Sequence, residues 1–278
     1  MKKVIALALA AVLALSLAAC GGTNSESQTN STGTSASGST AQTGVDLFGD
    51  PIAFLEGKKV GVQQGTTGDK FASDLDCQVM QFTKYADAVT ALEQGKVDAI
   101  VIDQQPAQAF INQKDNLAVF ETQLTQDEFA IAVKKGNTQL AEQFNQAIAE
   151  IKADGTMDAI LDKYINGTEG AQGYVTPEGT QYPNGKLIMA TNATYPPYEY
   201  LQGEEVVGID PEVAKAICDK LGYELVIQDM EFDAILAAVN SGKADFGAAG
   251  LTVTEERQKN VDFTDTYSQG ILVCMVKE

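Results

Sequence analysis

The sequence predicts an α/β protein built from two similar lobes, and three observations support this. Its 278 residues are enough for one large domain or two modest ones. Past residue 45, short apolar runs alternate with helical segments, as in a mainly parallel sheet covered on both faces. Residues 88–101 and 235–248 also repeat one unit, a helix followed by Gly-Lys-x-Asp and an apolar strand. Because ligands bind at the carboxyl ends of strands in open α/β sheets, two such units predict two lobes around a shared cleft.

Composition excludes several classes of function. The net charge is −19 and the pI is about 4.3, so nucleic acid is not an expected partner, because its phosphates repel an acidic surface. The chain has no His, which removes Ser-His-Asp and Cys-His catalysis and imidazole metal sites. No CxxC motif or Cys cluster occurs, so we expect no metal and no cofactor.

The N-terminus has the features of a targeting segment. Lys2 and Lys3 precede an apolar run from Val4 to Leu15, which is shorter than the ~20 residues of a membrane-spanning helix. Leu17-Ala18-Ala19-Cys20 follows and resembles the lipobox of bacterial lipoproteins, in which the Cys becomes the lipid-modified first residue of the mature chain. We therefore expect a signal peptide over residues 1–20 and a membrane anchor at Cys20. The alternative is an ordinary cleaved signal peptide with a chance Cys.

Residues 21–45 are rich in Ser, Thr, Gly, Asn and Gln and contain almost nothing to bury. Such a composition predicts a flexible linker. With an expected end-to-end distance of about 25–30 Å, this linker would hold the folded part near the membrane.

The first half of the folded part is predicted from apolar runs and their stop signals. Gly95 ends one helix, and Pro106 suits the first turn of the next. We expect strands over residues 58–63, 79–82, 97–102, 117–120 and 129–133. We expect helices over residues 70–75, 87–94, 107–114, 140–152 and 157–164.

The second half follows a connector over residues 166–185, which carries Gly, Pro, Asn and Thr and has no periodicity. We expect strands over residues 187–191, 223–227, 244–248 and 271–276, and helices over 211–221 and 232–239. Asp210 is expected to cap the first of these helices. Together with Glu212, it would mark a helix start and a solvated face.

The stretch from Ala248 to Arg257, AAGLTVTEER, resembles one side of an anion-binding pocket. Gly250 allows a ligand to approach the backbone closely. Thr252 and Thr254 are both good N-cap residues, and Thr252 with Glu255 has the spacing of a capping box. A helix starting here would direct free backbone N–H groups toward that space. Arg257 adds a fork of donors that matches a carboxylate. The alternative is a capped surface helix with an exposed Arg.

Several motifs together resemble a known family. ATNATYPPYEY (Ala190 to Tyr200), VVGIDPEVAKAI, MEFDAIL, AAGLTVTEER and VDFTDTY make residues 186–277 similar to the first lobe of the extracytoplasmic amino-acid-binding proteins of ABC importers. KVGVQQGTTGD, KVDAIVID and GTMDAILDKYING make residues 47–166 similar to the second lobe. The resemblance implies the type II periplasmic-binding-protein fold, with two Rossmann-like lobes and a ligand cleft between them.

The order of these segments is reversed relative to the usual family member. The sequence therefore resembles a circular permutation, with a second-lobe-like domain over residues 46–129, a crossover over 130–134 and a first-lobe-like domain over 135–278. The connector joins the former ends. Only the segment from Phe129 to Lys134 is then expected to cross between lobes, which predicts a wider or more variable open state. A swapped dimer is the alternative.

The resemblance also implies a role for each matching residue. Arg257 would bind the α-carboxylate of a free amino acid, helped by backbone N–H groups near Thr252 and near Thr66 or Thr67. Asp103, the Gly250 carbonyl and the Thr252 hydroxyl would accept from the α-ammonium. Tyr195 and Phe232 would sandwich the side chain. Asn192 and Gln63 would tune side-chain choice, although glutamine-binding relatives can carry Asp and Lys at these two positions.

Four of these residues also have an alternative interpretation in which they do not contact a ligand. Tyr195 could be a surface aromatic before a rigid Pro-Pro turn, and Phe232 could belong to the core. Asp103 could cap the helix that follows it, and Gln63 could be a solvated strand end.

The expected function is a receptor that captures a small polar amino acid outside the cell and delivers it to the permease subunits of an ABC importer, without being an enzyme. One alternative is a cyclohexadienyl-type dehydratase on the same fold, which would need an acidic catalytic group in the cleft. Another is a ligand-sensing module of a receptor.

Overall fold

The structure is a computed structural model that describes residues 45–278, which cluster as one compact unit. The predicted signal peptide, Cys20 and all but the last residue of the predicted linker lie outside the described residues. Within the described part, no helix is both long enough and apolar enough to cross a membrane.

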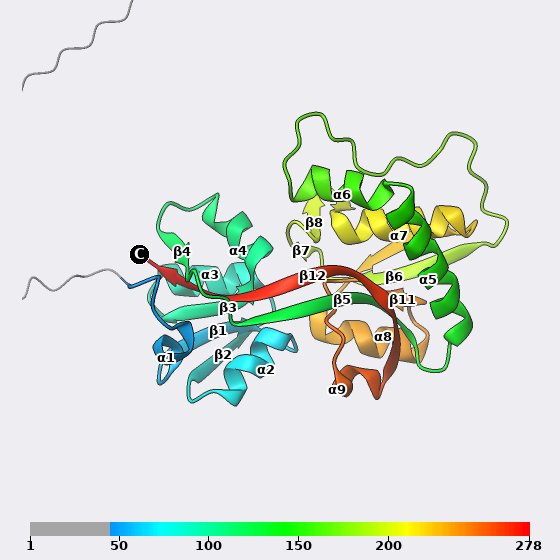
Figure 1. Cartoon of the computed structure of the whole chain (residues 1–278). Helices are drawn as coiled ribbons and strands as arrows, with labels where there is room; N and C mark the ends of the chain where they lie inside the picture. The colour runs from blue at the N-terminus through cyan, green and yellow to red at the C-terminus, as the bar shows by residue number, and fades with distance from the viewer. Residues whose placement is uncertain (1–44) are drawn as a thin grey trace, which may run out of the picture. The chain divides into compact units, whose positions relative to one another are not determined.

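A single nine-stranded sheet runs through the described residues (Figure 1). Its order is β10-β6-β11-β5-β12-β3-β1-β2, and β4 pairs with β12. The strands are β1 (Lys59–Gln63), β2 (Gln78–Phe82), β3 (Ala99–Asp103), β4 (Leu117–Val119), β5 (Thr125–Lys134), β6 (Lys186–Thr191), β10 (Glu224–Asp229), β11 (Phe246–Gly247) and β12 (Val261–Lys277). We call β1 to β4 the β1 half of the sheet, and β6, β10 and β11 the β6 half. The strands within β1–β2–β3 and β10–β6–β11 are parallel, as the alternating pattern predicts.

Helices cover both faces of this sheet (Figure 1). They are α1 (Pro51–Leu55), α2 (Thr67–Asp74), α3 (Tyr85–Glu93), α4 (Gln104–Ile111), α5 (Thr138–Ala153), α6 (Thr156–Tyr164), α7 (Ile209–Lys220), α8 (Ile235–Ser241) and α9 (Glu255–Gln258), with a 3-10 turn η1 (Phe232–Ala234) before α8. In β3, Ile100 and Ile102 belong to one apolar cluster, whereas Ala99 and Val101 belong to another. Alternate side chains of a strand point to opposite faces, so a fully apolar strand needs cover on both sides.

Two strands connect the halves, which corrects one expectation. β12 pairs with β5 from Val261 to Leu272 and then with β3 from Leu272 to Val276. β5 and β12 therefore both pass between the halves, and the prediction of a single crossing segment is wrong. The residues before Ile271 are largely polar, so the apolar pattern did not reveal the full length of β12. That part of the strand is also irregular, with register shifts between Phe263 and Ser268. The expected wider open state loses its basis, and the lobe boundaries stay a prediction.

Other differences concern local polar segments. The connector at 166–185 carries no helix or strand, as predicted. A second sheet of β7 (Thr194–Tyr195), β8 (Glu199–Gln202) and β9 (Glu205–Val207) was not predicted. Asp210 is not a cap on a solvated face: Gly208 precedes α7, and Asp210 lies inside the first turn, 1% exposed. Glu212 is mostly buried too, and its carboxylate accepts hydrogen bonds from Lys163 and Tyr164.

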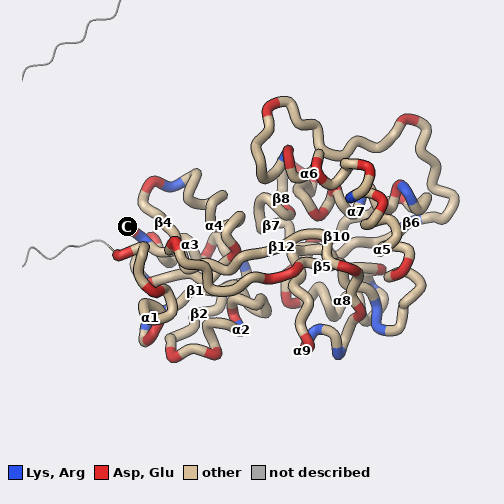
Figure 2. The backbone as a smooth tube through the Cα atoms, in the orientation of Figure 1, with Lys and Arg blue, Asp and Glu red and all other residues tan. Residues whose placement is uncertain are grey.

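Acidic residues occur along all parts of the described chain (Figure 2). Cys77, Cys218 and Cys274 are free thiols, and the last two are buried. The residues from 45 onward contain no group of three or more acidic, Cys or His side chains arranged to hold a metal.

Gly208 provides a test of how α7 is placed. Its φ of 135° and ψ of −174° lie in a region almost restricted to glycine, and a Cβ there would overlap the backbone carbonyl of Tyr198. We expect Gly208→Ala to lower the free energy of unfolding by about 3 kcal/mol or more. Gly203 is the matched control, since it also has a positive φ of 68° but nothing within 4 Å of a Cβ. Gly203→Ala should cost about 1 kcal/mol. Equal losses in denaturant titrations would contradict this account of the turn.

Candidate ligand-binding site

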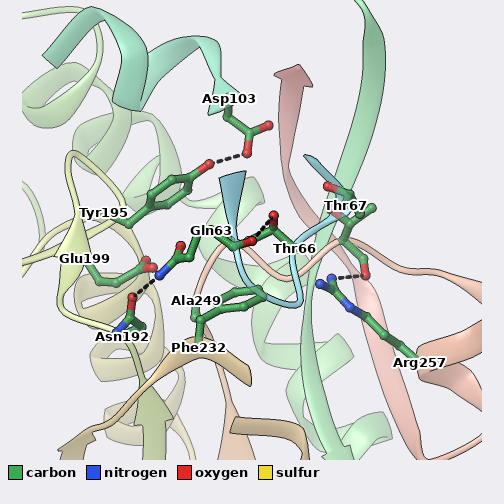
Figure 3. A pocket seen from close by; sticks show the side chains of 12 residues that line it. Gln63, Thr66, Thr67, Asp103, Asn192, Tyr195, Glu199, Phe232, Ala249 and Arg257 are labelled. Carbon is green, nitrogen blue, oxygen red and sulfur yellow. Dashed lines mark hydrogen bonds between the residues drawn. The ribbon is translucent and has the colours of Figure 1, made fainter. Parts of the chain in front are cut away.

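One pocket lies where the two halves of the sheet meet, and it brings together all ten residues predicted to contact a ligand (Figure 3). It contains about 310 Å³ not filled by atoms, part of it open to solvent. The lining residues are Gln63, Thr66, Thr67, Asp103, Asn192, Tyr195, Glu199, Phe232, Ala249, Gly250, Thr252 and Arg257. Glu199 and Ala249 are the two that the sequence did not reveal.

The topology of the sheet explains why distant residues converge here. Gln63 ends β1 and Asp103 ends β3, and the two strands are parallel neighbours. Asn192 directly follows β6. The carboxyl ends of both parallel sets therefore face the same space, as the rule for open α/β sheets predicts.

Arg257 is the single arginine of the chain, and it is only 9% exposed. Its Nη1 donates to the Thr252 carbonyl at 2.9 Å and its Nη2 to the Gly65 carbonyl at 3.1 Å, so the guanidinium connects the two halves. Burial lowers the pKa of Arg257 to about 10, which leaves it charged at neutral pH. The alternative of an exposed surface Arg therefore does not hold.

Of the two threonines predicted as suitable N-caps, Thr254 caps helix α9. The helix begins at Glu255, and the Thr254 hydroxyl accepts from Arg257 N at 3.2 Å. Thr252 does not cap the helix. It lies one turn earlier, where its backbone forms a bridge with Phe129. The Thr252 side chain lines the pocket instead.

Asp103 lies on the opposite side of the pocket. Although it occupies the N-cap position of α4, its side chain makes no capping bond, so the interpretation as a simple cap does not hold. Its Oδ2 accepts from the Tyr195 hydroxyl, whereas its buried Oδ1 has no partner among the described residues. Burial raises the pKa of Asp103 to about 7. The carboxyl therefore has one acceptor oxygen still available.

Asp127, on the crossing strand β5, determines what two pocket hydroxyls can do. Its Oδ2 accepts from Thr67 Oγ at 2.8 Å and from Thr252 Oγ at 2.9 Å. A threonine hydroxyl has one proton to donate. With both protons directed to Asp127, neither hydroxyl can donate to a ligand, but both can accept. This arrangement agrees with the expected role of Thr252 as an acceptor for an ammonium group.

Gln63 and Asn192 form one amide pair across the pocket. Gln63 Nε2 donates to Asn192 Oδ1 at 2.9 Å, as Figure 3 shows. Both residues are 2% exposed, so Gln63 is not a solvated strand end. The pair is one of three polar contacts between the halves at this pocket, with Tyr195 to Asp103 and Arg257 to Gly65.

The two predicted aromatic residues both line the pocket. Tyr195 is 8% exposed, so it is not a surface aromatic, and its ring stacks with Tyr85 and Tyr198 at centroid distances of 5.5 and 6.0 Å. Phe232 is half-buried, with the Arg257 guanidinium 5.5 Å from its ring centroid. That the two rings sandwich a ligand side chain stays a prediction.

Glu199 and Asp210 form an acidic pair beside the pocket. Glu199 is fully buried, and Asp210 Oδ2 accepts from Gly250 N at 2.8 Å. Burial, with the neighbouring Asp210, raises the pKa of Glu199 well above its ordinary range. Burial also raises the pKa of Asp210 to about 6. The sequence signal for Glu199 was weak because it stands in a polar hairpin next to exposed residues.

The fold is an α/β sheet with a pocket lined mainly by polar residues where its two halves meet. The family model described as bacterial extracellular solute-binding proteins, family 3, matches residues 50–167 and 187–278. The chain belongs to this family, which confirms the resemblance drawn from its motifs.

Individual relatives match over shorter stretches. The arginine-binding extracellular protein ArtP of Bacillus subtilis (strain 168) is 46% identical over 89 residues, which cover 32% of this chain and 35% of ArtP. The ABC transporter glutamine-binding protein GlnH of the same organism is 31% identical over 112 residues, covering 40% of this chain and 41% of GlnH. A solved structure of an ancestral arginine-binding protein bound to arginine is 46% identical, with a TM-score of 0.29, and the match covers 29% of this chain and 36% of that one. The chain thus spans well under half the length of these relatives.

Asp103 predicts a pH dependence of stability. The pKa of an aspartate is about 3.9 in an unfolded chain and about 7 for Asp103 in the fold. Between these values the folded protein binds more protons than the unfolded chain, so the free energy of unfolding falls as pH rises. Asp103→Asn stays neutral and should make this decline shallower, by up to about 1.4 kcal/mol per pH unit. Denaturant titrations of the ligand-free proteins at pH 5, 6 and 7 measure the slope, and parallel profiles would contradict the burial argument.

Proposed function

We propose that the protein binds a free polar amino acid outside the cell and delivers it to the permease subunits of an ABC importer. The observation that carries this proposal is that Arg257 and Asp103, both buried, line one pocket. They would bind the carboxylate and the ammonium of the amino acid. The names of the relatives, which refer to arginine, glutamine and an ABC transporter, support the substrate class and the partner.

The chemistry of a zwitterion fits these two groups. An amino acid carries one anion and one cation, and each needs a fixed partner once water is excluded. Arg257 supplies the donor fork for the carboxylate, and its bonds to two carbonyls hold it in place. Three acceptors would receive the ammonium: Asp103 Oδ1, the Gly250 carbonyl and the Thr252 hydroxyl. The Thr252 hydroxyl can act as an acceptor here because it donates its own proton to Asp127.

A catalytic role has less support. The relatives named above bind or transport amino acids. A ligand-sensing role has no specific observation in its favour.

The proposal extends to the membrane. A lipid on Cys20, followed by the linker up to residue 45, would keep the receptor near the permease at the outer surface of the bilayer. Release of the protein from cell membranes after Cys20→Ser, as followed by fractionation, would support the anchor.

We also propose the circular permutation. Glu121 N donates to Leu47 O and Phe120 N donates to Cys274 O, both at 3.0 Å, so the two ends of the described chain lie beside the same segment. The family match is interrupted at the connector. Adjacent termini and an exposed connector are what a permuted chain needs.

The test of the function is a calorimetric and thermal-shift screen of the common amino acids, followed by Arg257→Ala. A ligand at a hundredfold excess over its Kd should stabilise the protein by about 2.7 kcal/mol. Arg257→Ala leaves a buried carboxylate without its partner, so affinity should fall by about 30-fold or more. Lys259→Ala removes the same charge from an exposed position just after α9 and should leave affinity unchanged. If no amino acid binds, or if Arg257→Ala binds as well as the wild type, the proposal fails.

A further inference from the structure

The loop between β11 and α9 contains Gly250, whose two polar backbone atoms differ in their partners. Its N–H donates to Asp210 Oδ2 at 2.8 Å, whereas its carbonyl accepts no hydrogen bond from any other described residue. Gly250 also lines the pocket. Because the N–H is already in use, the carbonyl is the polar group that Gly250 can offer to a ligand.

The residues on either side of Gly250 are anchored in the core. Ala249 and Leu251 are each 1% exposed and belong to the same apolar cluster. Leu251 is also held by its carbonyl, which accepts from Ala130 N at 3.0 Å. Gly250 itself has a φ of 53°, in the left-handed region that glycine adopts readily. Without a side chain, Gly250 is the least restricted residue of this loop, so a contact from outside the loop has to fix its conformation.

Asp210 supplies that contact, although it is a buried carboxyl group. It lies in the first turn of α7 and is 1% exposed, and none of the ion pairs among the described residues includes it. Burial raises the pKa of Asp210 to about 6, and the bond from Gly250 N opposes this shift. Burial and the neighbouring Asp210 raise the pKa of Glu199 well above its ordinary range. At neutral pH, Glu199 is therefore the uncharged member of this pair, and the negative charge lies on Asp210.

We propose that Asp210 is a positioning residue for the ammonium site, which holds Gly250 N so that the Gly250 carbonyl is directed into the pocket as an acceptor. The inference rests on the proposed function and adds to it a residue that does not touch the amino acid. Peptide groups are planar, so a bond at Gly250 N and an anchored Leu251 together leave the carbonyl between them one orientation. A buried carboxylate destabilises the fold, and this role accounts for its presence where an apolar side chain would pack more favourably.

Hydrogen exchange at Gly250, followed by NMR on the full chain, tests the contact without any ligand. Gly250 lies outside the helices and strands, yet its N–H should exchange slowly in the wild-type protein. Asp210→Ala should speed this exchange by about tenfold or more, because a hydrogen bond to a charged acceptor is lost. Asp210→Asn should keep most of the protection, because its amide oxygen can still accept.

Binding of two matched pairs of probes, measured by calorimetry, tests the role in the ammonium site. Arginine and glutamine are each compared with the analogue that lacks only the α-amino group. Asp210→Ala should weaken binding of the amino acid by about tenfold or more, because its ammonium loses a fixed acceptor. Binding of the analogue should change by less than about threefold. Asp210→Asn should restore amino-acid binding to within about threefold of the wild type, because the bond to Gly250 N is kept.

Asp262→Ala is the matched control. Asp262 Oδ2 also accepts from a glycine N–H, that of Gly136 at 2.7 Å, but neither residue lines the pocket. This variant should leave the affinities for the amino acid and for its analogue unchanged. Unfolding temperatures show whether each variant is folded, and the exchange rate in the wild-type protein needs no variant.

The outcomes separate the inference from the proposed function. Fast exchange at Gly250 in the wild-type protein, or unchanged exchange in Asp210→Ala, overturns the contact. Equal losses for the amino acid and its analogue in Asp210→Ala, or no recovery in Asp210→Asn, indicate a purely structural role and overturn the inference, while amino-acid binding stands. If neither arginine nor glutamine binds, the ammonium site assigned to them is overturned, and the inference fails with it.

Discussion

The central constraint on this molecule is the cost of burying charged groups that face one another across a small space. Arg257, Asp103 and Glu199 are all buried, and all line the same pocket. In the ligand-free protein, Arg257 is held by two backbone carbonyls and Asp103 by the Tyr195 hydroxyl. Each of these is a neutral partner, and neutral partners compensate a buried charge less well than an opposite charge does. A ligand that brings a carboxylate and an ammonium would supply an opposite charge for Arg257 and one for Asp103.

The topology of the sheet makes this arrangement possible. β5 and β12 run antiparallel through both halves, so the carboxyl ends of two separate parallel sets are held facing each other. Asp127 on β5 then binds one hydroxyl from each side, Thr67 and Thr252. The contacts that close the pocket involve the groups that a ligand would use, so ligand binding would be coupled to the way the halves meet.

Much of this could be predicted from the sequence, and the omissions have physical causes. Apolar runs revealed β1 and β3, and the strand-end rule pointed to Asp103, whereas Gln63 was assigned from the family resemblance. The AAGLTVTEER stretch revealed Arg257 through its donor chemistry. The sequence did not reveal Glu199 or the burial of Asp210, because an acidic residue in a polar hairpin or at a helix start is usually solvated. Only tertiary contacts, such as Gly250 N donating to Asp210, bury these carboxyl groups. The first part of β12 is also polar, so the sequence did not reveal that β12 is a second strand crossing between the halves.

A crystal structure of the protein with the amino acid that stabilises it most tests the central claim directly. We expect the ligand carboxylate on the Arg257 guanidinium and the ligand ammonium on Asp103, within about 3 Å of donor and acceptor atoms, with Tyr195 no longer the sole partner of Asp103. A ligand bound elsewhere, or one bound in this pocket with its carboxylate away from Arg257, would contradict the account.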